Sequence, residues 1–172
     1  MRLQLGILIL FLVLPATLTA QAREDSVDVF DFEALDLDGQ TFDGRSLRGK
    51  TVLIDFWAIW CAPCVKAFPQ LSRLQDELGG DTFQVLGMAA YSGGPARVKQ
   101  FLSDKGVSYP VLVVDADLVE QFGVIGYPTY FLVDGEGHVQ QKFVGELSRL
   151  YDEIAALVNQ ESGDRNPAGE EK

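Results

Sequence analysis

The chain has 172 residues, of which 47% are apolar and 10% aromatic, so it is long and apolar enough to bury one sizeable core. Its formal net charge at pH 7 is -11, which disfavours a nucleic-acid-binding protein because phosphate contacts need a basic surface. We therefore expect one folded domain with additions at its ends, and an acidic surface that serves solubility.

The N-terminus has the pattern of an export signal. Arg2 precedes an apolar stretch from Leu3 to Leu14, and Ala20-Gln21-Ala22 has the spacing of a cleavage site. We predict a signal peptide over residues 1–22, with cleavage after Ala22. If it is retained, the longer run over residues 3–22 would serve as a membrane tether. Both alternatives place the domain at residues 23–160 outside the cytoplasm, in the periplasm.

The first predicted strands form a hairpin and a buried central strand. Strands over Val29–Ala34 and Gln40–Phe42 flank Asp38-Gly39, a dipeptide typical of tight hairpin turns. Thr51–Trp57 is almost continuously apolar and rich in β-branched and aromatic residues. Such a run suits a strand that is covered on both faces of a sheet.

A helix is predicted over Pro63–Leu78. Pro63 fits its first turn, where a missing N–H costs nothing, and Pro69 inside the helix should bend it. Its apolar residues recur at helical spacing. They are Phe68, Leu71, Leu74 and Leu78.

The remaining elements continue the alternation and then change to a hairpin and a closing helix. This order implies an α/β fold with a mixed central sheet flanked by helices. Residues 161–172 are charged and rich in Gly and Pro, and we predict a disordered tail there. The predicted strands are Phe83–Ala89, Tyr109–Val114, Tyr130–Val133 and His138–Val144, and the predicted helices are Ala96–Lys105, Leu118–Phe122 and Ser148–Val158.

The two cysteines, Cys61 and Cys64, lie between a buried strand and a helix start. A bridge across so short a loop stabilises little, and a structural zinc site needs four ligands, so we expect redox chemistry without a metal or other cofactor. A helix N-terminus favours a thiolate, which makes Cys61 the expected exposed nucleophile. Cys64, one turn further and shielded, can resolve a mixed disulfide formed at Cys61.

Asp55 interrupts the apolar run of the central strand. Burying it in the charged form would be costly, so its pKa should rise, which suits a proton acceptor for Cys64. The alternative is an Asp that is paired with a Lys or solvated at the strand edge.

Three segments resemble the thioredoxin superfamily, and the signal peptide and the Gly93-containing segment resemble its exported TlpA/ResA branch. The resemblance implies a thioredoxin fold with an N-terminal β-hairpin extension and an insertion after the second core strand. It also implies that Pro128 is the family's cis-proline, beside the attacking Cys61 and the resolving Cys64. The residues that carry the resemblance are Trp57 to Cys64, Pro69, and Gly126-Tyr127-Pro128-Thr129, and those expected to bind substrate are Trp60, Ala62, Pro63 and Tyr127.

The chain departs from its relatives at two places. ResA-type reductases carry a Glu in the loop after the second core strand, where this chain has Ala90-Tyr91-Ser92. The strand Phe83–Ala89 also lacks the Lys that neighbours the buried Asp in cytosolic thioredoxins. The partner of Asp55 therefore stays open at this stage.

The preferred function is an exported reductase of protein disulfides, re-reduced by a membrane thiol electron donor, in cytochrome c or cytochrome oxidase assembly. An oxidase or isomerase is a close alternative, although Ala62-Pro63 lacks the His that would make a strong oxidant. A Cu(I) chaperone would use Cys61, Cys64 and His138, which is expected to be exposed, but copper-delivery relatives use a wider cysteine spacing. A thiol peroxidase is disfavoured because Ala58 stands where those enzymes have Thr.

Overall fold

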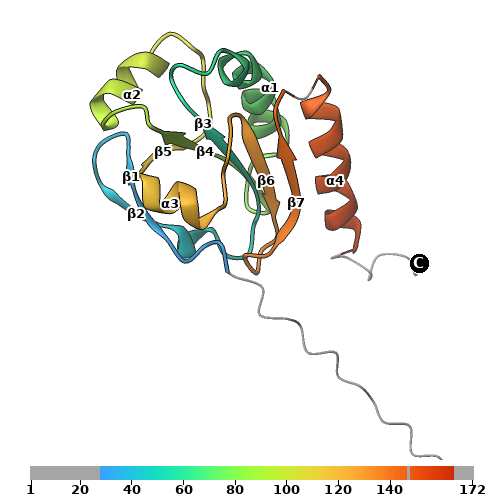
Figure 1. Cartoon of the computed structure of the whole chain (residues 1–172). Helices are drawn as coiled ribbons and strands as arrows, with labels where there is room; N and C mark the ends of the chain where they lie inside the picture. Colours follow the sequence, from blue (N-terminus) through green and yellow to red (C-terminus); the bar gives the residue numbers. More distant parts are fainter. Residues whose placement is uncertain (1–27, 147, 165–172) are drawn as a thin grey trace, which may run out of the picture.

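Seven strands, four α-helices and one short 3-10 helix make up residues 28–146 and 148–164, the part of the chain that this computed structural model describes (Figure 1). In chain order they are β1 (Glu33–Asp36), β2 (Thr41–Asp43), the 3-10 helix η1 (Gly44–Leu47), β3 (Thr51–Trp57), α1 (Ala62–Leu78), β4 (Phe83–Ala90), α2 (Pro95–Leu102), β5 (Val111–Val114), α3 (Ala116–Gln121), β6 (Thr129–Val133), β7 (Val139–Val144) and α4 (Leu150–Asp164).

All strands belong to one mixed sheet, as predicted. Their order across the sheet is β2-β1-β5-β4-β3-β6-β7. The three inner strands β3, β4 and β5 are parallel, whereas β6 runs antiparallel to β3 and β1 runs antiparallel to β5. The hairpins β1–β2 and β6–β7 form the two outer edges. The carboxyl ends of the parallel strands therefore lie at one end of the sheet, and residues 58–61 leave β3 there.

Strand β3 is the central strand because its sequence suits burial on both faces. All seven of its residues are buried. Val52, Ile54 and Phe56 face one layer, whereas Leu53 and Trp57 face the other. Each large apolar side chain that is taken out of water contributes about 1.5–3 kcal/mol to folding. The strand that leads to Cys61 is thus one of the best anchored in the fold.

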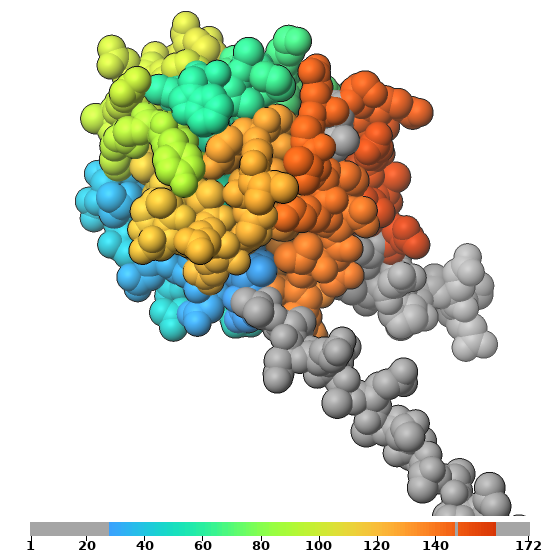
Figure 2. Space-filling model, in the orientation of Figure 1, coloured from blue at the N-terminus to red at the C-terminus, as the bar shows by residue number. Residues whose placement is uncertain are grey.

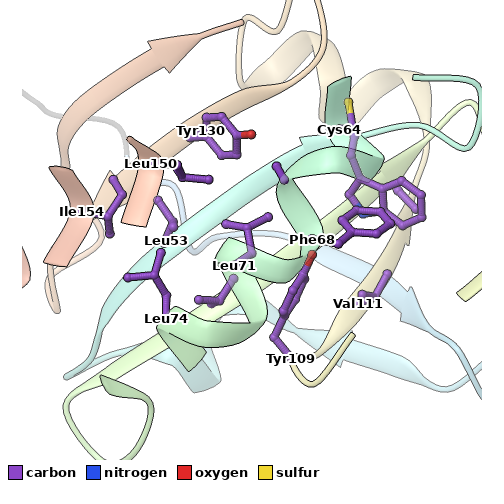
Figure 3. Packing of buried hydrophobic residues seen from close by; sticks show 14 of the residues in the cluster. Leu53, Cys64, Phe68, Leu71, Leu74, Tyr109, Val111, Tyr130, Leu150 and Ile154 are labelled. Carbon is purple, nitrogen blue, oxygen red and sulfur yellow. The ribbon is translucent and has the colours of Figure 1, made fainter. Parts of the chain in front are cut away.

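Helices cover both faces of the sheet. Helices α1, α2 and α4 pack on the face that contains Leu53 and Trp57, and α3 covers the other face together with residues 28–32 and η1. Figure 3 shows the first of these layers, where Phe68, Leu71 and Leu74 project from α1 toward the sheet. On α4, the residues that complete this layer are Leu150, Ile154 and Val158.

The N-terminal hairpin is present but starts later than predicted. Residues 28–32 form turns instead of a strand, because Asp28 Oδ1 accepts the Phe30 N–H at 3.0 Å and Phe32 N bonds Phe30 O. Both Phe side chains are nevertheless buried in the core. In the β1–β2 turn, Asp36 Oδ1 accepts two backbone N–H groups and Gly39 has a φ of 77°, which an L side chain rarely adopts.

The closing helix also differs from its prediction. It begins at Leu150 instead of Ser148, since Gln70 Oε1 on α1 accepts the first-turn N–H of Tyr151 at 3.3 Å and supplies the capping interaction. It runs to Asp164, past the expected end of the domain at residue 160. Helix α2 ends at Leu102, short of the predicted Lys105.

Two sequence predictions lie outside the described residues. They are the signal peptide or tether over residues 1–22 and most of the predicted tail at residues 161–172. Among residues 28–146 and 148–164, the helices are too short or too polar to span a bilayer.

Candidate active site

Strand β3 and helix α1 hold the two cysteines in place. Cys61 is the N-cap residue of α1, and its Sγ accepts the Cys64 N–H at a distance of 3.3 Å. Pro63 lies in the first turn, where its missing N–H leaves no bond unmade. The Cys64 N–H and the positive end of the helix dipole therefore lie at the Cys61 sulfur, where they favour negative charge.

Cys61 and Cys64 form a disulfide, with their Cα atoms 5.3 Å apart, so the structure is the oxidised form. Cys61 is 5% exposed and Cys64 is fully buried. The order of accessibility agrees with the roles expected of an attacking and a resolving thiol. Cys61 is nevertheless less exposed than predicted, because it belongs to the same buried core cluster as Cys64 and Phe68.

The loop after β4 is tied to the loop that leads to Cys61. Ser92 is buried, its hydroxyl accepts the Ile59 N–H at 3.0 Å, and it donates to Ala90 O at 2.9 Å. The preceding residue, Tyr91, has a φ of 48°, the only positive φ of a residue other than Gly in the described segments. Such strain persists only where the surrounding contacts impose it, and it is common at functional sites.

The segment before β6 forms the other side of the site. The Tyr127–Pro128 peptide bond is cis, as the resemblance implied. Gly145 N donates to Pro128 O at 2.8 Å, and Thr129 Oγ1 donates to Gly126 O at 2.8 Å. Because Thr129 pairs with Phe56 near the end of β3, this segment lies at the same end of the sheet as Cys61.

Three aromatic rings form a rim beside Cys61, which we call the aromatic rim: Trp60, Tyr91 and Tyr127. The Trp60 and Tyr127 ring centroids are 5.6 Å apart and those of Tyr91 and Tyr127 are 6.5 Å apart, both edge-to-face. Trp60 is 63% exposed and Tyr91 is 59% exposed. Figure 2 shows the segments around residues 60 and 91 at the surface, on the same face of the molecule. Ala62 is also exposed, in the first turn of α1, where Pro63 is half-buried.

Asp55 is fully buried on β3, two residues before Trp57. Both of its carboxylate oxygens lack a hydrogen-bond partner among the described residues. Burial raises the pKa of the Asp55 carboxyl well above its ordinary value of 3.8. The shift agrees with the sequence prediction, and the alternatives of a Lys partner or a solvated strand edge are wrong.

His138 is remote from the cysteines, which argues against the copper ligand of the Cu(I)-chaperone alternative. It follows β6 in the hairpin beyond Val133, and Val133 pairs with Val52 at the beginning of β3, whereas Cys61 follows the end of β3. His138 is also half-buried instead of exposed, with its Nδ1 3.6 Å from carboxylates of Asp134 and Glu136.

Sequence reasoning missed several residues of the site. From sequence, Tyr91 and Ser92 stand out only for the absence of a Glu, and Tyr109 is predicted in a strand without a role in the site. Tyr91 stands next to Ser92 and close to Gly93-Gly94, so the turn composition was the one available signal. Contacts between loops that are distant in sequence cannot be found from such local patterns.

Comparisons with known proteins bear on the site. The Redoxin family model matches residues 22–158. Thiol-disulfide oxidoreductase ResA of Bacillus thuringiensis (strain Al Hakam) is 30% identical over 120 residues, which cover 69% of this chain and 69% of the relative. Thiol:disulfide interchange protein DsbE of Yersinia pestis is 31% identical over 137 residues, covering 78% and 70%. The crystal structure of a thioredoxin-family thiol:disulfide interchange protein from Chlorobium tepidum TLS, 28% identical, has a TM-score of 0.68 and covers 80% of this chain and 99% of its own. The thioredoxin fold is thereby confirmed.

Proposed function

We propose, since the chain belongs to the redoxin family within the thioredoxin superfamily, that it reduces protein disulfides through Cys61 and Cys64. The chain is a thiol–disulfide oxidoreductase, and the finer assignment to reduction is our proposal. The observation that carries it is the Cys61 sulfur at the N-cap of α1, accepting the Cys64 N–H. Such a position favours the thiolate that attacks a disulfide.

The proposed reaction has two exchange steps. The Cys61 thiolate attacks one sulfur of a substrate disulfide, and the other substrate sulfur leaves as a thiolate. Cys64 then loses its proton and attacks the Cys61 sulfur, which releases the second substrate thiolate and forms the Cys61–Cys64 disulfide seen here. Two electrons pass to the substrate, so a donor thiol must re-reduce the pair.

In this proposal Asp55 accepts the proton that Cys64 loses. Its carboxyl is buried without a hydrogen-bond partner, and a base with a raised pKa takes up a thiol proton more readily than an ordinary carboxylate. When the proton returns to solvent, Asp55 is ready for another cycle. The role is analogous to tuned carboxylates in other active sites, where burial sets the proton affinity.

The proposed substrate surface consists of the aromatic rim, Ala62, Pro63 and Pro128. The rim offers an apolar platform beside the sulfur that attacks, and rigid aromatic rings contribute contact area with little loss of side-chain entropy. Pro128 lies in the segment before β6, at the same end of the sheet as Cys61, where it would align the substrate backbone.

We place this reaction outside the cytoplasm, from the export pattern of residues 1–22. The domain is then either free in the periplasm or tethered through residues 3–22, and a membrane thiol donor supplies its electrons. The proposed substrates are disulfide-containing proteins of cytochrome c or cytochrome oxidase assembly, in line with the resemblance to the TlpA/ResA branch.

The first test is the reduction potential of the Cys61–Cys64 couple, measured by equilibration with defined thiol buffers. A potential near or below roughly -270 mV, the value of thioredoxin, supports a reductase, whereas one near roughly -120 mV marks an oxidant and overturns the proposed direction. Insulin reduction by the same preparations tests activity on a protein disulfide, with Cys61→Ser as the inactive control.

The proton role of Asp55 is tested with dithiobis(nitrobenzoate). Attack by Cys61 releases one coloured arylthiolate, and attack by Cys64 on the mixed disulfide releases the second. Asp55→Asn should slow the second release and leave the first unchanged. Equal rates in the variant and the wild type for both releases would refute the role.

A further inference from the structure

Three buried polar groups of the core have no hydrogen-bond partner among the described residues. They are the carboxylate of Asp55, the indole N–H of Trp57 and the hydroxyl of Tyr109. Asp55 and Trp57 are fully buried, and Tyr109 is 5% exposed. An unpaired polar group in a protein interior costs about 1–3 kcal/mol, so three of them in one core require an explanation.

The three groups lie around a single glycine. Asp55 pairs with Gly87 in the parallel ladder of β3 and β4, so both positions face the same side of the sheet. A Cβ atom at Gly87 would lie 3.2 Å from Trp57 Nε1 and 3.2 Å from Tyr109 Cε2. Because Gly87 has no side chain, both rings approach the sheet beside Asp55. Figure 3 shows the Tyr109 hydroxyl pointing into this core.

The donors and acceptors of the three groups are complementary. An ionised carboxylate only accepts hydrogen bonds, an indole N–H only donates, and a phenol hydroxyl can donate. Desolvation is the one cause of the raised pKa of Asp55, so no cation contributes there. Among the described residues, the buried ionisable side chains of this layer other than Asp55 and the two cysteines are Tyr109, before β5, and Tyr130, on β6.

We propose that Tyr109 is a positioning residue for the exchange reaction: with the indole N–H of Trp57, its hydroxyl donates to the Asp55 carboxylate when Asp55 gives up its proton. Two neutral donors then occupy the role that a lysine has beside the buried Asp of cytosolic thioredoxins. This inference rests on the proposed proton role of Asp55.

The protonation state of Tyr109 fits this role. Burial first, and the Asp55 charge second, raise the pKa of the Tyr109 hydroxyl well above its ordinary value. The hydroxyl therefore keeps its proton at neutral pH and is a donor whenever Asp55 ionises. Neutral donors stabilise the carboxylate without the strong charge of a lysine, so Asp55 retains a high proton affinity.

The test uses Tyr109→Phe, which removes the hydroxyl and keeps the ring. The reduced chain is mixed with dithiobis(nitrobenzoate), and the second arylthiolate release, which reports the Cys64 step, is followed from about pH 5 to about pH 9. Loss of the donor should raise the Asp55 pKa, moving the pH profile of this release to higher pH and slowing it about tenfold near neutrality. The first release should be unchanged.

A matched control and a double variant separate this role from a packing effect. Tyr151→Phe removes a hydroxyl that bonds Glu77 at the surface, and its profile should equal that of the wild type. In an Asp55→Asn background, Tyr109→Phe should have no further effect on the second release, since the group it serves is absent. An equal slowing in both backgrounds would show a merely structural role.

The outcomes also distinguish this inference from the function on which it rests. If Asp55→Asn slows the second release but Tyr109→Phe leaves its pH profile unchanged, the role of Tyr109 is refuted and that of Asp55 stands. If Asp55→Asn leaves the second release unchanged, both fail.

Discussion

Replacing Asp55 by Asn should stabilise the oxidised protein by an amount that grows with pH. The carboxyl is fully buried without a hydrogen-bond partner among the described residues, and burial raises its pKa well above 3.8. At pH values between the ordinary pKa of an Asp and the raised pKa of Asp55 in the folded protein, Asp55 is ionised in the unfolded chain but still protonated in the folded chain. Raising the pH in this window therefore favours unfolding.

The magnitude follows from proton linkage. Because only the folded state holds this proton, the unfolding free energy of the wild type falls by about 1.4 kcal/mol for each unit that the pH rises, until the pH reaches the folded pKa of Asp55. Asn carries no such proton, so the difference between variant and wild type should widen by about 3 kcal/mol over two pH units of the window. The buried amide has a polar cost of its own, but that cost does not depend on pH.

Urea unfolding of both oxidised proteins, from about pH 4.5 to about pH 8, measures this difference. Subtraction of the wild-type value from the variant value removes the contributions of all other ionisable groups, because both proteins share them. The pH at which the difference stops growing gives the folded pKa of Asp55. A difference that is constant across the range would refute the account of Asp55 as a buried, unpaired acid.

Two further predictions concern the loops around Cys61. Tyr91→Ala should raise the KM for an aromatic peptide disulfide severalfold and leave the reduction potential unchanged, because the ring contacts Tyr127 in the rim and not the sulfurs. The control is Leu35→Ala, which removes an exposed side chain on β1, and equal KM values for Tyr91→Ala and the wild type would contradict a substrate role. Ser92→Ala should lower the unfolding free energy by about 1–2 kcal/mol, since it removes the acceptor for the Ile59 N–H and the donor to Ala90 O. If urea unfolding shows a loss below a few tenths of a kcal/mol, other contacts hold the two loops together.

The parts of the fold that the sequence predicts well are those with a strong local signal. The continuous apolar run of β3 and the helical spacing of Phe68, Leu71 and Leu74 each specify an element without help from distant residues. Cys61 at the start of α1 could be placed because the strand, the cysteines and Pro63 are adjacent in sequence. The redox pair was therefore predictable together with the helix end that serves it.

The parts that escaped prediction depend on contacts across the sheet. In the sequence, Gly87 is a residue that disfavours a strand. Only its pairing with Asp55 and the atoms around it show that it makes room for the Trp57 and Tyr109 rings. The start of α4 is similar, because Gln70 on another helix accepts the Tyr151 N–H, and the helix begins at Leu150 instead of the predicted Ser148. Register and interhelical contacts determine these positions, and neither is encoded in a local window.

The sulfur of Cys61 terminates helix α1 as well as reacting. In the oxidised state a covalent tie to Cys64 and a bond from the Cys64 N–H fix this end of the helix. In the proposed cycle, reduction breaks the covalent tie and leaves a Cys61 thiolate, and a charged sulfur attracts the same N–H more strongly than a disulfide sulfur does. On this proposal, the covalent bond at the Cys61 sulfur is replaced by an electrostatic interaction at the same atom, so the first turn of α1, which carries Cys64, stays anchored in both redox states.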